Sequence, residues 1–61
     1  MIFYLYYLAD QLGPITGDKT LQGSFSDLAS AQAKASADGI AHYSVEKDVG
    51  DGSNITIVFI I

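Results

Sequence analysis

The chain has 61 residues, of which 49% are hydrophobic and 16% charged, and its formal net charge is −4 at pH 7. This composition differs from that of disordered chains, so we expect one folded domain over residues 1–61. Seven acidic residues against three lysines argue against direct binding to nucleic acid or to an anionic membrane. Because the sequence has no cysteine, it also excludes disulfides and thiolate metal sites.

Residues 1–8, MIFYLYYL, form an apolar run rich in aromatic and β-branched side chains, which predicts a buried strand. The run lacks the basic segment and cleavage site of a signal peptide, and it is too short to cross a bilayer. We therefore expect a cytoplasmic protein. Residues 11–20 are rich in glycine, proline and aspartate and predict a loop, after which residues 21–23 could pair back as a short second strand.

The clearest helical segment is SFSDLASAQAKASADG, residues 24–39. Its alanines favour a helix, and Ser26 is the predicted N-cap. Gly39 suits the left-handed position after the helix, where Ile40 could fold back onto Ala35 in a Schellman motif. Because the predicted buried face is made mostly of small side chains, we expect the helix to lie close to a sheet.

Two more strands follow the helix. Residues 40–49 alternate between apolar and polar side chains, which predicts a strand with one solvent-facing side, made of His42, Ser44, Glu46 and Asp48. Residues 49–54, VGDGSN, are typical of a hairpin turn, and residues 54–61 predict a final strand that is apolar on both faces from Val58 onward.

These elements predict an α+β fold in which a single helix packs on one face of a small three- or four-stranded sheet, in the order β-(β)-α-β-β. We expect the two most apolar strands, residues 1–8 and 54–61, to be a parallel central pair with the other strands outside. The predicted core consists of Phe3, Leu28, Ile57 and Phe59. The opposite face, bearing Tyr4, Tyr6, Val58 and Ile60, would have no cover within the chain, so a second protein or a second copy would cover it.

The sequence offers little for catalysis. His42 is the only histidine, and Glu46 is four residues further along the same predicted strand, about 13 Å away at ~3.3 Å per residue. We predict an ordinary solvent-facing histidine and no enzymatic activity. Asp48, Asp51, Ser53 and Asn54 could supply oxygen ligands to a hard cation, but their spacing does not match an EF-hand loop. A polar hairpin turn is the commoner explanation, and no metal or cofactor is predicted.

The acidic residues form the remaining candidate site. Glu46, Asp48 and Asp51 gather at the predicted hairpin, while Asp10 and Asp18 lie in the long early loop. They could be a solubilising rim, or an acidic face that imitates nucleic-acid phosphates and enters a basic groove. The tyrosines Tyr4 and Tyr6 suit a protein interface because they join a large apolar ring to a polar hydroxyl.

In its size, acidity, lack of cysteine and order of elements, with FSDLASAQAKASADG followed by IAHYSVEKDV, the chain resembles small phage-encoded inhibitors of bacterial machinery, anti-CRISPR proteins among them. The resemblance implies a non-enzymatic inhibitor in the host cytoplasm, which binds a CRISPR effector or another protein with a basic nucleic-acid-binding groove. It carries over no site residue. The predicted partner-binding residues are Glu46, Asp48, Asp51, Asp10, Asp18, Tyr4 and Tyr6. The alternative is a structural homo-oligomer, such as a homodimer, that pairs through its uncovered sheet face.

Overall fold

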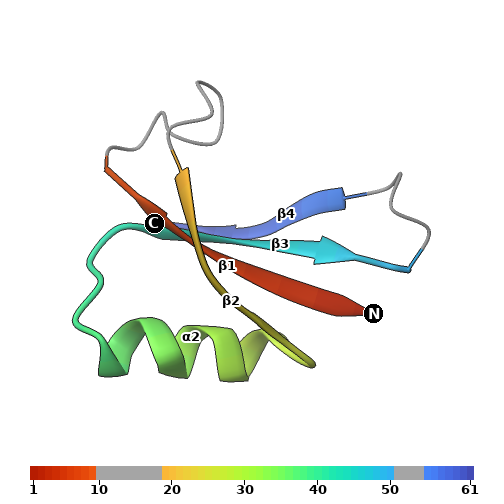
Figure 1. The fold of residues 1–61 in the computed structure, drawn as a ribbon, viewed down its shortest axis with the longest axis horizontal. Helices are drawn as coiled ribbons and strands as arrows, with labels where there is room; N and C mark the ends of the chain where they lie inside the picture. Colours follow the sequence, from red (N-terminus) through yellow and green to blue (C-terminus); the bar gives the residue numbers. More distant parts are fainter. Residues whose placement is uncertain (10–18, 51–54) are drawn as a thin grey trace.

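Four strands and one helix make up the part of the chain that the computed structural model describes, which comprises residues 1–9, 19–50 and 55–61. The elements are β1 (Ile2–Leu8), β2 (Lys19–Phe25), α2 (Leu28–Ala37), β3 (Tyr43–Asp48) and β4 (Ile55–Ile60). Helix α2 lies beneath one face of the sheet and follows the direction of its long axis (Figure 1). The predicted α+β class, with a single helix on one face of a four-stranded sheet, is confirmed.

The strands are ordered β2-β1-β3-β4, and all neighbouring pairs are antiparallel. The predicted order, with a parallel central pair of β1 and β4, is wrong. Residues 38–42 connect α2 to β3, and this short connection brings β3 directly beside β1, where the Leu8 N–H donates to the His42 carbonyl over 3.1 Å. The next strand, β4, then pairs only with β3 and lies at the edge.

Both ends of α2 are fixed by hydrogen bonds, one to a side chain at the start and others within the backbone at the end. At the start, the Asp27 carboxylate accepts a hydrogen bond from the Ser30 N–H over 2.7 Å, so the N-cap is Asp27 and the prediction of Ser26 is wrong by one residue. This bond lowers the pKa of Asp27. At the other end, Gly39 has a φ of 69° and the Ile40 N–H donates to the Ala35 carbonyl over 2.9 Å, which confirms the predicted Schellman motif.

A small core lies between α2 and the sheet. Leu5, Ala31, Ala35 and Val45 are completely buried there. The two alanines have short side chains, so the helix packs closely on β1 and β3. Several larger side chains pack around this centre and are partly buried: Phe3, Phe25, Leu28, Ile40, Tyr43 and Phe59. Phe3, Leu28 and Phe59 therefore contribute to the core as predicted, whereas Ile57 is 45% exposed and its assignment to the core is wrong.

One extra residue in β4 explains the error at Ile57. Val45 pairs with Phe59, but the next residue, Glu46, pairs with Ile57, so Val58 forms a β-bulge. Side chains alternate between the two faces of a strand, and one inserted residue reverses the alternation beyond it. Phe59 therefore lies on the helix side of the sheet with Val45, whereas Ile57 lies on the opposite side with Glu46.

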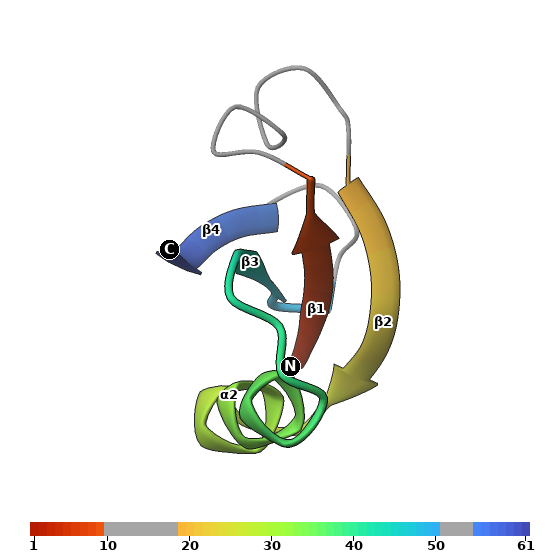
Figure 2. The ribbon, with the colours of Figure 1, turned by 90° about the vertical axis from the view of Figure 1, so that its left-hand side faces the viewer.

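A second bulge occurs in the other edge strand. Leu5 pairs with Gly23 and Tyr6 with Leu21, which leaves Gln22 as the extra residue in β2. Bulges increase the local twist of a strand. Both edge strands bend strongly, and the sheet is curved rather than flat (Figure 2). Strand β2, expected only at residues 21–23, extends to seven residues.

The side of β3 that was predicted to face solvent is covered. Ser44 is fully buried and Glu46 is only 7% exposed. The reason is the central position of β3, because its neighbours on both sides place side chains beside these two residues. Tyr4 pairs with Glu46 on one side and Ile57 pairs with it on the other. An alternating pattern predicted the two faces of this strand correctly but not that both would be buried.

Candidate protein interface

Strand β4 presents an exposed apolar surface at the edge of the sheet. The residues concerned are Ile55, Ile57, Val58, Ile60 and Ile61, which we call the β4 edge. Each of them exposes between 38% and 54% of its surface. No residue from Ile55 to Ile61 is charged. Exposed single hydrophobic residues are normal on proteins, but a contiguous row along an edge strand is unusual.

The backbone of the β4 edge is also available for pairing. Tyr43 and Ile61 exchange two hydrogen bonds, with N···O distances of 3.3 and 3.1 Å, so their peptide groups face one another. In an antiparallel ladder the direction of the N–H and C=O groups alternates along each strand. The N–H and C=O of Ile60 therefore point away from β3, toward the outer side of the sheet.

The opposite edge of the sheet has a different chemical character. Strand β2 reads KTLQGSF and contains lysine, threonine, glutamine, glycine and serine, in addition to its bulge. A charged residue, polar side chains and a bulge are devices with which proteins protect an edge strand from pairing with other chains. Strand β4 has a bulge and one polar residue, Thr56, but no charged residue, so the two edges of this sheet are not equivalent.

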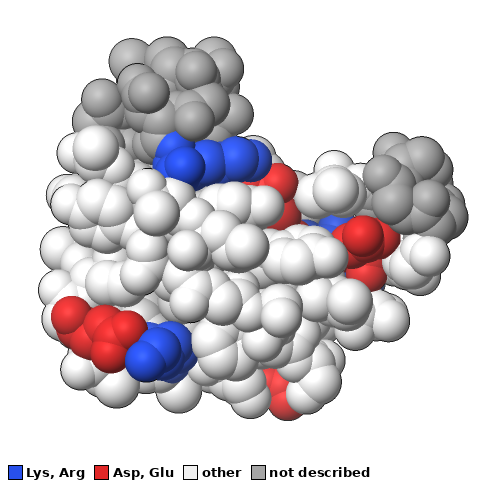
Figure 3. Space-filling model, viewed as in Figure 1, with Lys and Arg blue, Asp and Glu red and all other residues white. Residues whose placement is uncertain are grey.

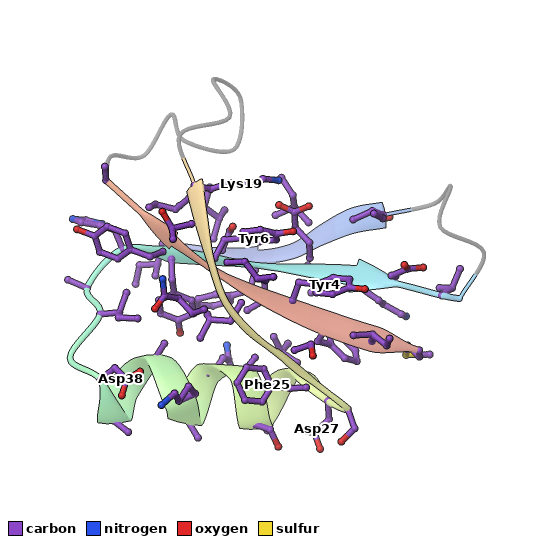
Figure 4. The ribbon with its side chains drawn as sticks, viewed as in Figure 1. Tyr4, Tyr6, Lys19, Phe25, Asp27 and Asp38 are labelled. Carbon is purple, nitrogen blue, oxygen red and sulfur yellow. The ribbon has the colours of Figure 1, made fainter. Side chains whose placement is uncertain are left out.

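A polar cluster lies on the face of the sheet away from α2. The Lys19 ammonium contacts the Glu46 carboxylate at 2.6 Å and lies 4.4 Å from the centre of the Tyr6 ring. Tyr4, Tyr6 and Lys19 all lie on this side, whereas Phe25 lies toward the helix (Figure 4). The Glu46 side chain is only 9% exposed, so the ion pair is largely shielded from water. Beside it, the Ser44 hydroxyl is buried and has no hydrogen-bond partner among the described residues.

The predicted acidic site is only partly within the described chain. Glu46, expected at the surface, is instead buried and paired with Lys19, because β3 is a central strand. The Asp48 carboxylate accepts a hydrogen bond from the Gly50 N–H over 2.8 Å. Asp10, Asp18 and Asp51 lie outside the described residues, as do Ser53 and Asn54 of the alternative cation site. Within residues 1–9, 19–50 and 55–61, no three histidine or acidic side chains gather closely enough to hold a metal ion.

The remaining predicted residues are partly accessible. Tyr4 and Tyr6 are half-buried, and they lie on the face away from α2, as expected. His42 is exposed, although it precedes β3 instead of lying within it. Sequence reasoning missed Lys19, which is 27 positions from Glu46 along the chain. The sequence carries no clear signal for this pair, because the two residues are far apart along the chain and neither lies in a recognisable motif.

Charged atoms lie in small separate groups on the face shown in Figure 3, and most of this face is uncharged. One such group is the pair of Lys34 and Asp38, whose Nζ and Oδ2 atoms are 3.2 Å apart. On this face, therefore, the acidic side chains do not form a single patch. In the described residues, α2 is the one helix, and its ten residues are too few to cross a membrane.

Binding to another polypeptide is the chemistry that the β4 edge can support, since it combines exposed apolar side chains with outward-facing peptide groups. The chain was compared with protein-family models, with curated proteins and with solved structures, and none of them matches it. The resemblance to phage-encoded inhibitors therefore stays a prediction.

Proposed function

We propose that this domain is a non-enzymatic protein-binding module whose interface is the β4 edge. The observation that carries the proposal is the row of exposed, uncharged side chains on an edge strand whose Ile60 peptide groups face outward. An extended segment of another chain can add itself to such an edge, so that main-chain hydrogen bonds supply affinity and side-chain contacts supply specificity.

The apolar edge supports protein binding better than the acidic face does. Among the predicted acidic contacts, Glu46 is turned toward Lys19 and is shielded from solvent. Charge complementarity with a basic groove would then depend on Asp48 and on the acids outside the described residues. When a partner covers the β4 edge, in contrast, the burial of its apolar surface contributes about 25 cal/mol of binding free energy per Å².

Site-specific photo-cross-linking tests this proposal directly. A photoreactive phenylalanine analogue placed at Ile57 is expected to give a covalent adduct with another polypeptide in the cells that produce the protein. The matched control places the same analogue at Ser36, an exposed position on α2. Residue 36 lies on the helix, away from β4, and is expected to give no adduct (Figure 1).

The masses of the adducts separate the outcomes. An adduct formed from residue 57 and not from residue 36 supports an interface at the β4 edge, whatever the partner is. The absence of an adduct from residue 57, or equal yields of adduct from the two positions, would overturn the proposal.

A further inference from the structure

We infer that the polypeptide that covers the β4 edge is a second copy of this chain, with the two β4 strands paired antiparallel about a two-fold axis. The two four-stranded sheets would then join into one eight-stranded sheet. This inference rests on the proposed function, because it names the partner of the same edge.

The composition of β4 suits pairing with itself. A two-fold interface brings the same residues together from both copies, so it must tolerate each side chain beside its own equivalents. The sequence ITIVFI has no charge to repel its copy, no proline to interrupt the ladder and no glycine. Cross-strand contacts between β-branched side chains stabilise a sheet, and four of the six residues of β4 are isoleucine or valine.

Backbone geometry favours the antiparallel orientation, because parallel pairing is slightly less stable per residue. Charge does not oppose it. Asp48 lies on β3 and pairs with Ile55 at one end of β4, whereas Ser44 and Tyr43 pair with Ile60 and Ile61 at the other. In the joined sheet both β4 strands lie between the two Asp48 residues, which are therefore at least about 14 Å apart at ~4.8 Å per strand spacing. With Ile55 opposite Ile60 of the second copy, the equivalent ends are also about 17 Å apart along the strands at ~3.4 Å per residue. Both separations exceed the Debye length of ~8 Å at physiological ionic strength.

The size of the domain is the third argument. The described chain exposes 3699 Å², and a typical stable interface covers about 800 Å² of each partner, or about a fifth of that surface. The β4 edge has exposed residues on both faces of the sheet, Ile57 and Ile60 on one and Ile61 on the other, and Val49 is exposed nearby. Domains of about 60 residues bury little apolar surface in their own core. Apolar surface buried between two copies would add to the stability that one core provides.

Sedimentation equilibrium of the purified full chain over a concentration series measures the association. The parent chain is expected to form dimers. The Ile57→Lys variant is expected to weaken the dimer at least about tenfold, because it replaces an apolar contact with a charge beside its own equivalent. Ser36→Lys on α2 adds the same charge outside the interface and is expected to leave the dimer unchanged.

Isotope-filtered NMR on a mixture of labelled and unlabelled parent chains gives the orientation without any substitution. Contacts between Ile55 of one copy and Ile60 of the other are expected. A chain that stays monomeric at millimolar concentration overturns the inference, as does a dimer that Ile57→Lys leaves intact or one whose contacts lie on α2. If the chain is monomeric and residue 57 still cross-links to a different polypeptide, only the second copy is excluded and the proposed function stands. If residue 57 also gives no adduct, both fail.

Discussion

Replacing Leu5 with alanine is expected to destabilise the domain by about 2–5 kcal/mol, the usual range for a buried leucine. Leu5 is completely buried at the centre of the sheet and packs with Ala31, Ala35 and Val45. The alanines beside it have no flexible side chains that could move into the space left behind. The cavity therefore persists, and its cost adds to the lost burial of the three carbon groups that the substitution removes.

This loss is large for so small a domain, because native domains are stable by only ~5–15 kcal/mol and small ones lie near the lower end. Urea denaturation at one fixed protein concentration measures the change, since association would otherwise alter the apparent stability. Leu21→Ala is the matched control, because Leu21 is 54% exposed and the same chemical change there is expected to cost less than about 1 kcal/mol. Equal losses at the two positions would show that Leu5 is not the centre of the core.

Replacing Lys19 with methionine is expected to be the second most destabilising change, at about 1–3 kcal/mol. The substitution leaves the Glu46 carboxylate without the ammonium that lies 2.6 Å from it, in a position where the Glu46 side chain is only 9% exposed. Breaking a fully buried ion pair costs ~3–5 kcal/mol, and the smaller value here reflects the 28% exposure of the Lys19 side chain. The stacking of Lys19 on Tyr6 is lost as well.

A double-mutant cycle identifies the cause. Glu46→Gln removes the buried carboxylate charge that Lys19→Met leaves unpaired. The Lys19→Met, Glu46→Gln double variant is therefore expected to be more stable than Lys19→Met alone. Thermal or urea denaturation of the four proteins at one pH gives the coupling. If the two single losses simply add in the double variant, the pair contributes nothing specific to stability.

The sequence predicted most of the local structure because local patterns determine it. The alternation and apolar content of the strands, the alanines of the helix and Gly39 at its end all act within a few residues. At the helix, the N-cap differs by one residue, because Asp27 follows Ser26 directly and both residue types cap helices well. Strand β2 is longer than its three predicted residues, because its polar residues gave no clear strand pattern.

The strand order could not be predicted from how apolar each strand is. Strand β4 is, with β1, one of the two most apolar strands, and the usual inference from such a run is a central position. Its connection to β3 instead makes it the second strand of a hairpin at the edge. The apolar side chains that suggested burial inside this domain are those that point to burial against another chain.

The sequence does not show which side chains of β3 and β4 face the core, because a bulge and a long-range ion pair leave no clear sequence pattern. The Val58 bulge reverses the alternation of β4, so Ile57 lies on the face opposite the core. The partner of Glu46 comes from a strand on the far side of β1, and only the three-dimensional arrangement brings Lys19 to it. Glu46, which was predicted to belong to an acidic face at the hairpin, is therefore buried.

Amide hydrogen exchange at Ile60 tests most directly whether the β4 edge is covered by another chain. The Ile61 N–H, which donates to the Tyr43 carbonyl over 3.1 Å, is the internal reference on the same strand. With a partner on β4, we expect the outward-facing Ile60 amide to exchange slowly in the concentrated protein and faster on dilution or in Ile57→Lys. Fast exchange at Ile60 beside a protected Ile61, both in the concentrated protein and in an extract of the cells that produce it, would contradict an interface at this edge.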